Sequence, residues 1–288
     1  MGLMMNMKGY GWSNGAASII NAVATWKGSA FAIELVTRAV VELDHSSGIK
    51  GDVPGVDTRL IERCVERVLD HLGLEYGGRV RTSSEIPIAS GLKSSSAAAN
   101  AVILATLDAL DVDMDLVSAA KIGVEAAREV GVTITGALDD ALASMLGGVV
   151  VTDNREMSLL RRDELNCSVM LLVPDQRIFS RDTDISRSRI IAPMADLAFD
   201  LAMQADYGRA MTLNGLAYCA ALGLSSEPLI LALEKGARGA SLSGTGPSYA
   251  ALIDESKMDG LEESWRALGG RVIRTKANNR CASRGQGF

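Results

Sequence analysis

The sequence predicts an α+β protein, and its length, its apolar content and the order of its elements lead to this fold class. The chain has 288 residues, of which 48% are hydrophobic, so it can bury a large core and is long enough for two domains that share a cleft. The predicted strands and helices are mixed, without the regular alternation of a doubly wound sheet. A charged bend over residues 154–164 places the expected domains at 1–155 and 156–288, with one large domain as the alternative.

The first half of the chain mixes strands with helices. Residues 29–37 and 79–86 have the apolar pattern of strands. Apolar residues at helical spacing between them lie after Asp57, which can cap a helix, and before Gly73, which suits a left-handed helix end. Further helices are predicted at 94–110, 115–130 and 137–146, followed by a strand at 149–151.

The second half continues with a similar mixture. Strands are predicted at 168–173, 249–253 and 271–275, and helices at 193–222, 226–236 and 261–268. A basic and polar loop at 175–189 leads from the first of these strands to the long helix. It carries the arginines Arg177, Arg181, Arg187 and Arg189.

The composition favours a small ligand over a nucleic acid, a membrane or a zinc ion. Acidic residues outnumber basic ones by 35 to 29, so the chain lacks the positive surplus that nucleic-acid backbones require. No stretch approaches the ~20 apolar residues of a membrane span. The 2 histidines and the dispersed cysteines do not supply the closely spaced ligands of a structural zinc site. We therefore expect a small-molecule partner, with neither nucleic acid nor membrane.

The cysteines and the amino terminus indicate the cytoplasm. Cys64, Cys167, Cys219 and Cys281 lie far apart and form no Cys-x-x-Cys pair, which is typical of buried, reduced thiols. The amino terminus has neither an apolar signal core nor a small-residue cleavage site. The expected location is therefore cytoplasmic, and the sequence leaves monomer and homodimer both open.

The most informative segment is a loop of small and polar residues at 85–99, which leads into an alanine-rich helix. Gly91 allows the backbone to approach a ligand closely. The serines Ser94 to Ser96 offer hydroxyl and N–H groups at the positive end of the helix dipole. Lys93 adds a positive charge among them, and a solvated surface lysine is the alternative for this residue. Together these features predict a phosphate-binding loop.

The pattern Pro87-x-x-x-Gly91-Leu92-x-Ser94-Ser95 resembles the ATP-binding signature of the GHMP kinases, the superfamily of galactokinase, homoserine kinase and mevalonate kinase. It is not a Walker A loop, because the chain contains no Gly-Lys dipeptide. The resemblance implies that Lys93 is catalytic and that ATP contacts a continuous run of residues. This run is Pro87, Ile88, Ala89, Ser90, Gly91, Leu92, Lys93, Ser94, Ser95, Ser96 and Ala97.

The segment from Thr135 to Gly148 resembles the catalytic helix of the superfamily, in which an acidic residue lies seven positions before a glycine. That residue is Asp140 here, with Asp139 as the runner-up. The resemblance implies that it faces the reacting hydroxyl and accepts or orients the proton. Both aspartates also suit a helix start, where they complement the dipole.

A magnesium ion is implied by the same resemblance. Glu129, eleven residues before Asp140, lies where mevalonate-kinase-like members keep a Mg²⁺ carboxylate, and Ser95 is the expected hydroxyl ligand. Glu125, one helical turn earlier, competes for this role. An exposed glutamate on a helix face is the alternative for either residue.

Two further segments complete the resemblance in the expected order along the chain. Gly15 to Ala22 is a run of small residues, and Ser241 to Ser248 is a glycine turn before a strand. Such segments bring backbone groups against a substrate or a phosphate. The implied acceptor-binding residues are Asn21, Asp140, Ser243, Gly244, Thr245 and Gly246.

Within the superfamily, the serine loop and residues 131–141 are most similar to the archaeal-type shikimate kinases. This resemblance implies a ribosomal-S5-like amino-terminal domain and a ferredoxin-like carboxyl-terminal domain. It also implies direct transfer of the γ-phosphoryl group of ATP to shikimate, giving shikimate 3-phosphate and ADP. Homoserine or mevalonate kinase activity and a non-catalytic ATP-binding protein are the alternatives. The shikimate carboxylate needs a bidentate arginine, for which the arginines of the 175–189 loop are the candidates.

A different pattern near the amino terminus points to another enzyme class. Gly11-Trp12-Ser13-Asn14-Gly15 matches the G-x-S-x-G elbow of serine hydrolases. No apolar strand precedes it, and the only histidines are His45 and His71, of which His71 belongs to the helix that ends at Gly73. A hydrolase is therefore disfavoured.

Overall fold

The computed structural model of the chain describes residues 7–133, 135–175 and 185–285, and these residues form two sheets. The first sheet contains β1 (Met7–Ile20), β2 (Lys27–Asp44), β3 (Ile49–Gly51), β4 (Gly77–Ser84), β5 (Val149–Asp153), β6 (Ser158–Asp163) and β11 (Ser283–Arg284). The second contains β7 (Ser168–Val173), β8 (Gly239–Leu242), β9 (Tyr249–Ile253) and β10 (Arg271–Lys276). Its strand order is β10-β7-β9-β8, whereas the first sheet runs β11-β1-β2-β4-β3, with β5 paired to β2 and β6 to β5.

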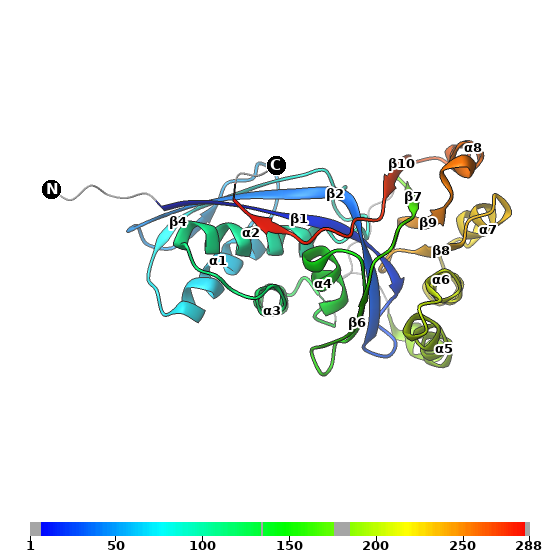
Figure 1. Cartoon of the computed structure of the whole chain (residues 1–288), viewed down its shortest axis with the longest axis horizontal. Coiled ribbons are helices and arrows are strands. Elements are labelled where there is room, and N and C mark those ends of the chain that lie inside the picture. The colour runs from blue at the N-terminus through cyan, green and yellow to red at the C-terminus, as the bar shows by residue number, and fades with distance from the viewer. Residues whose placement is uncertain (1–6, 134, 176–184, 286–288) are drawn as a thin grey trace.

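One set of helices packs on the first sheet, and a second set lies beside the second sheet (Figure 1). The first set is α1 (Arg59–Leu72), α2 (Ser94–Leu110), α3 (Leu116–Glu129) and α4 (Leu138–Leu146). The second set is α5 (Ala192–Met203), α6 (Tyr207–Leu222), α7 (Glu227–Glu234) and α8 (Met258–Arg266), with short 3-10 helices at Ser186–Ile191 and Glu255–Lys257. Helices α5 and α6 also contact β1 of the first sheet. The mixture of helices with largely antiparallel strands confirms the α+β prediction. β6 and β11 follow residue 155 and yet join the first sheet, so the division into 1–155 and 156–288 stays a prediction.

Strand β1 is not evident from the sequence over its full length, because glycines stand where a strand usually carries apolar side chains. A Cβ atom on Gly9 would lie 2.1 Å from the carbonyl oxygen of Ala105, and one on Gly11 would lie 2.3 Å from that of Ala101. The backbone of α2 therefore packs directly on β1, and only glycine leaves room for it. This close contact fixes α2, whose amino end carries the serine loop.

The predicted helix at 193–222 is wrong in one respect, because the structure divides it into α5 and α6. Ala205 between them has a left-handed backbone with φ of 62°, which an α-helix does not tolerate. Asp206 then caps α6, since its side chain accepts a hydrogen bond from the Arg209 N–H at 3.3 Å. The other helices match their predictions within three residues at each end.

Buried apolar side chains continue from one sheet to the other. One cluster at the junction includes Ile19 and Phe31 of the first sheet, Leu171 of the second, and Leu92 of the serine loop. Leu92 is only 1% exposed. The serine loop is therefore anchored in the core between the two sheets.

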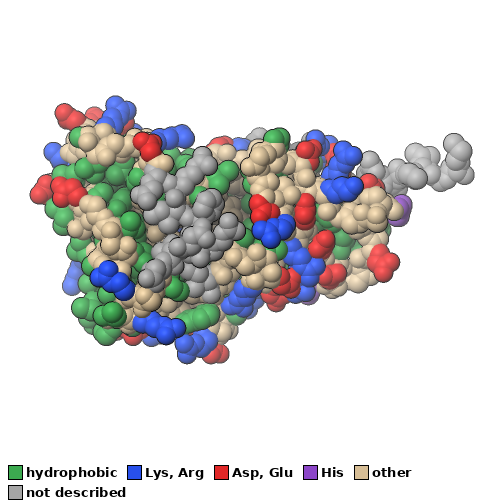
Figure 2. All heavy atoms as spheres, turned by 180° about the vertical axis from the view of Figure 1, so that it is seen from behind, with side chains coloured by type: hydrophobic (Ala, Val, Ile, Leu, Met, Phe, Trp, Pro, Cys, Tyr) green, Lys and Arg blue, Asp and Glu red, His purple; other side chains and the backbone are tan. Residues whose placement is uncertain are grey.

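Three further features relate to the expectations from composition: the surface charges, the helix lengths and the burial of the cysteines. Figure 2 shows acidic and basic side chains interspersed over one face, without a basic patch. Within the described ranges, no helix combines the length and the apolar character that crossing a membrane requires. Cys64 and Cys219 are buried free thiols and Cys167 is half-buried, but Cys281 is exposed, so the expectation of burial is wrong for Cys281.

Candidate active site

A cavity of about 510 Å³ lies where α2 and α4 begin. Its walls come from the β1–β2 turn, the serine loop with α2, the segment that leads into α4, and the β8–β9 turn. The predicted site residues that line it are Asn21, Ile88, Ala89, Gly91, Lys93, Ser94, Ser95, Ser96, Asp140, Gly244 and Thr245. The structure thus brings together parts of all four segments that were singled out in the sequence.

Side-chain hydrogen bonds hold three of these segments against one another. Ser243 Oγ donates to the carbonyl of Gly91 at 2.8 Å and accepts from the Ser18 N–H at 3.2 Å. Ser18 Oγ in turn accepts from the Gly244 N–H at 3.0 Å. Asn21 Nδ2 donates to the carbonyl of Gly244 at 2.8 Å. The β8–β9 turn is therefore tied both to the serine loop and to the end of β1.

Some predicted binding residues shape the loops and do not line the cavity. They are Pro87, Ser90, Leu92, Ala97, Ser243 and Gly246. The carbonyl of Pro87 accepts a hydrogen bond from Ser90 Oγ at 2.7 Å, and Leu92 and Ala97 are buried in the core. These residues therefore shape the loops and support the site from behind.

Replacement of Gly91 by alanine is expected to separate the two loops. Gly91 has φ of 82°, and a Cβ atom there would lie 2.3 Å from the carbonyl oxygen of Ser243. Left-handed strain alone is worth about 1–3 kcal/mol, and the clash adds to it. Thermal unfolding should show a lower Tm and the variant should lose activity.

The matched control for Gly91→Ala is Gly73→Ala. Gly73 has φ of 67°, and no atom lies within 4 Å of the position that a Cβ atom would take there. Gly73→Ala should lose stability through backbone strain alone and keep its activity. Equal losses of stability in the two variants would contradict the proposed clash.

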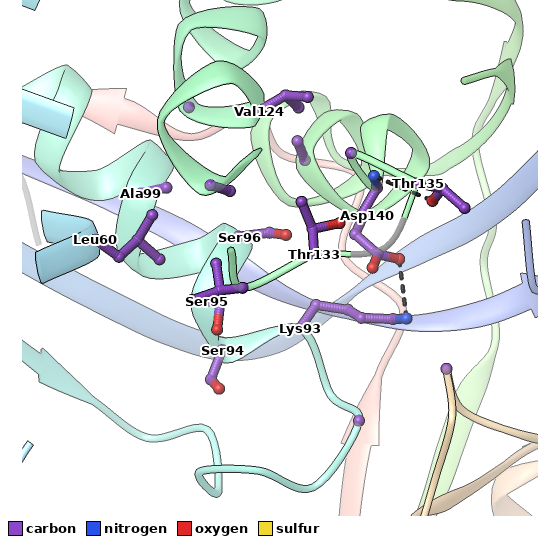
Figure 3. A pocket seen from close by; sticks show the side chains of 18 of the residues that line it. Leu60, Lys93, Ser94, Ser95, Ser96, Ala99, Val124, Thr133, Thr135 and Asp140 are labelled. Carbon is purple, nitrogen blue, oxygen red and sulfur yellow. Dashed lines mark hydrogen bonds and ion pairs between the residues drawn. The ribbon is translucent and has the colours of Figure 1, made fainter. Parts of the chain in front are cut away.

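Lys93 and Asp140 form an ion pair inside the cavity. Lys93 Nζ lies 2.9 Å from Asp140 Oδ1, and the side chains are 8% and 15% exposed. Figure 3 shows Lys93 reaching past the serines toward Asp140. A lysine this buried is not a solvated surface residue, so that alternative does not hold.

The backbone at Lys93 explains how its side chain reaches Asp140. Lys93 precedes the first turn of α2 and has a left-handed conformation, with φ of 63°. For a residue with a Cβ atom this conformation is unfavourable by roughly 1–2 kcal/mol. Such strain is typically retained where it positions a functional group.

The neighbouring Asp139 is more deeply buried than Asp140. It is 3% exposed, and both residues line the cavity. Burial, together with the charge of Asp140, raises the pKa of Asp139 to about 7. Asp140 is thus the carboxylate that has a cationic partner and is the more open to a ligand.

Comparison with known proteins identifies the family. Residues 59–148 match the model of the GHMP kinases N terminal domain. A shikimate kinase from Methanothrix thermoacetophila is 60% identical over 97% of this chain and 97% of its own length. The chain belongs to the GHMP kinase family. A shikimate kinase from Methanosarcina mazei is also 55% identical, over 96% of each chain.

Solved GHMP kinase structures share the fold. A homoserine kinase from Cytophaga hutchinsonii superposes with a TM-score of 0.76 at 17% identity, and the match covers 99% of each chain. The mevalonate kinase of Methanococcus jannaschii gives a TM-score of 0.74 at 17% identity, over 96% of this chain and 99% of its own. These likenesses confirm the predicted GHMP kinase fold and say nothing about the acceptor.

Glu129 has the position in the sequence that the resemblance implies, but its side chain lies outside the cavity. Its carboxylate accepts a hydrogen bond from Arg63 on the surface between α1 and α3. Glu125 is likewise bonded to Arg67. The magnesium role of Glu129 or Glu125 therefore stays a prediction, and the surface ion pairs of both residues do not favour it.

Replacement of Glu129 by alanine is expected to leave turnover and its Mg²⁺ dependence within about twofold of the wild type. An exposed ion pair contributes about 0–1 kcal/mol to stability, so a small decrease in Tm is the only effect anticipated. Initial rates over a series of Mg²⁺ concentrations check this. A large increase in the Mg²⁺ requirement would support Glu129 as a ligand.

An apolar lobe of the cavity has no clear signal in the sequence. Leu60, Ala99 and Val124 point into it from α1, α2 and α3 (Figure 3). It is completed by Gly123, Ala127, Val130, Val132 and Thr133. In the sequence most of these residues belong to ordinary apolar helix faces, and Val132 and Thr133 to the segment after α3, so only the packing of α1, α2 and α3 reveals that they line a pocket.

The arginine candidates for a substrate carboxylate stay a prediction, because none of those that the structure describes lines the cavity. Arg177 and Arg181 lie outside the described residues. Arg187 and Arg189 are exposed and do not line the cavity.

Ser13 of the hydrolase-like pattern is fully buried, and its hydroxyl is hydrogen-bonded to Ser144. It is therefore not an accessible nucleophile.

Proposed function

We propose that this GHMP kinase transfers the γ-phosphoryl group of ATP to a hydroxyl of shikimate, giving shikimate 3-phosphate and ADP. One observation carries the proposal: the serine loop, Lys93 and Asp140 line one cavity in a chain that is 60% identical to a shikimate kinase. The homoserine and mevalonate kinases are similar only at the level of the fold, at 17% identity.

The serine loop and α2 are the proposed site for the ATP phosphates. Helix geometry leaves the first N–H groups of α2 without intrahelical acceptors, and the serines there line the cavity. These donors and the helix dipole favour a polyanion. The apolar lobe between α1 and α3 offers the adjoining surface for the base.

Asp140 is the proposed partner of the reacting hydroxyl. The hydroxyl loses its proton as its oxygen attacks the γ-phosphorus, and a carboxylate within reach accepts or orients that proton. Lys93 holds this carboxylate in place and brings a positive charge toward the phosphates. Positioning and charge neutralisation then supply most of the rate, because no covalent intermediate is required.

The residues that line the cavity fit a magnesium ion bound mainly through the phosphates. Mg²⁺ usually keeps several waters and takes only one or two protein ligands. The Ser95 hydroxyl lines the cavity, and so does Asn100, whose buried Oδ1 has no hydrogen-bond donor among the described residues. These two groups would hold the ion, which neutralises charge on the β and γ phosphates when bound.

The test is a panel of acceptors. The purified protein with ATP and Mg²⁺ is offered shikimate, homoserine or mevalonate, and ADP release is followed. We expect turnover with shikimate alone. Turnover with one of the other acceptors and none with shikimate would overturn the proposal. Nucleotide binding without turnover on any acceptor would identify a non-catalytic relative.

A further inference from the structure

The reaction described above leaves one buried acidic group of the cavity without a task. Asp139 directly precedes Asp140 at the start of α4, and it is 3% exposed. A carboxyl group is costly to bury unless it is paired or hydrogen-bonded. Its retention beside the reacting centre therefore calls for an explanation in terms of a ligand.

A short chain of buried polar groups fixes one oxygen of this carboxyl. Asp139 Oδ1 accepts a hydrogen bond from Asn154 Nδ2 at 2.8 Å. Asn154 Oδ1 accepts one from Thr152 Oγ1 at 2.7 Å. This bond orients the amide of Asn154 so that its Nδ2 faces Asp139. Asn154 and Thr152 are both fully buried. The carboxyl is therefore held rigidly from the β5 side.

The second oxygen, Oδ2, lies against Gly28 at the start of β2. A Cβ atom on Gly28 would be 2.6 Å from Asp139 Oδ2, so glycine is needed there to admit the carboxyl. Within the described ranges, Asn154 is the one side chain that donates a hydrogen bond to Asp139. The nearby cation Lys93 is paired with Asp140 instead. Apart from the backbone N–H of Asp139 itself, the described residues offer the carboxyl no further donor, so Oδ2 is the oxygen that a ligand hydroxyl can address.

The position of Asp139 points to the acceptor and not to the nucleotide. Its carboxyl lies against Gly28, which closely follows the β1–β2 turn, and Asn21 of this turn lines the cavity. Asn21 is also bonded to Gly244 of the β8–β9 turn. Asp139 therefore lies on the side of the cavity that faces the second sheet, away from the apolar lobe.

We propose that Asp139 Oδ2 accepts a hydrogen bond from the hydroxyl next to the one that is phosphorylated. Two consecutive carboxyl groups then contact two consecutive hydroxyls, and the acceptor class selected is a vicinal diol. Shikimate has such a pair, whereas homoserine and mevalonate do not. Asp139 is then a residue that determines the specificity for the acceptor. The inference rests on the proposed function and extends it to acceptor selection.

The test is a double-mutant cycle in which one change removes the carboxylate of Asp139 and the other removes one hydroxyl of the substrate. Wild type and Asp139→Asn are assayed with shikimate and with 4-deoxyshikimate, which lacks the neighbouring hydroxyl. A hydrogen bond to a charged group corresponds to about a 10- to 100-fold loss of kcat/KM. We expect this loss when either partner is removed and only a small further loss when both are. Independent losses that multiply would overturn the assignment of Asp139.

Two controls keep the outcomes distinct. Affinity for an ATP analogue, measured without acceptor, should be unchanged in Asp139→Asn, and a loss there would indicate a structural role. Gly28→Ala keeps the charge but displaces the carboxyl, so it should reproduce the loss on shikimate if Asp139→Asn folds poorly. Wild type that is inactive on shikimate would refute the proposed function and this inference together, whereas activity without coupling refutes only the inference.

Discussion

Replacement of Asp140 by asparagine is expected to lower turnover about a hundredfold or more, while the fold and the affinity for an ATP analogue are retained. Asparagine has the shape of aspartate but cannot accept the proton of the attacking hydroxyl. The side chain is 15% exposed in the cavity, so the substitution disturbs no core packing. Turnover is measured by ADP release with saturating shikimate, and analogue binding by calorimetry.

The comparison for Asp140→Asn is Glu129→Ala, which removes a carboxylate outside the cavity and should leave turnover unchanged. Thermal unfolding of both variants excludes a general loss of structure. Near-normal turnover of purified Asp140→Asn would transfer the catalytic role to Asp139 or remove it altogether.

Replacement of Lys93 by alanine is expected to weaken nucleotide binding by about tenfold to a hundredfold, which is typical for the loss of a hydrogen bond to a charged group. The ammonium group is the partner of Asp140, so its loss also leaves that carboxylate without a counter-charge, and kcat should decrease as well. Calorimetric titration with an ATP analogue and steady-state kinetics give the two effects separately.

Lys93→Gly separates the charge of this residue from its backbone strain. The left-handed conformation at position 93 suits glycine better than alanine by about 1 kcal/mol, so Lys93→Gly should be the more stable variant. Its activity should be as low as that of Lys93→Ala. Unchanged ATP-analogue affinity in both variants would argue against a phosphate contact.

Most of the secondary structure followed from periodicity and from helix-end signals. Helix α2 begins at Ser94 and ends at Leu110, as predicted, and Gly73 ends α1 with the expected left-handed backbone. Asp57 was expected to cap α1, but the residue directly before the helix is Thr58. The side chain of Asp57 instead accepts a hydrogen bond from the Arg59 N–H. Strands β3, β6, β8 and β11 were not predicted, because their short, polar or small-residue sequences lack a strand pattern, and β6 lies in the segment that was predicted to be a bend.

The order of four motifs along the chain was enough to indicate the family, since glycines, serines and aspartates at fixed spacings reflect local backbone needs. Spacing alone did not reveal whether each side chain faces the cavity or the surface. Glu129 has the expected position in the sequence, yet Arg63 holds it on the surface.

Local sequence patterns were sufficient to predict the α+β class, the serine loop that leads into α2 and the acidic pair at the start of α4, because each depends on neighbours within a few residues. The packing of distant segments was needed to establish that Lys93 faces Asp140, that Asp139 is held by Asn154, and that three helices enclose an apolar lobe. These relations join residues that are far apart in the chain. They depend on how the helices pack on the first sheet and on one another, which no local pattern encodes.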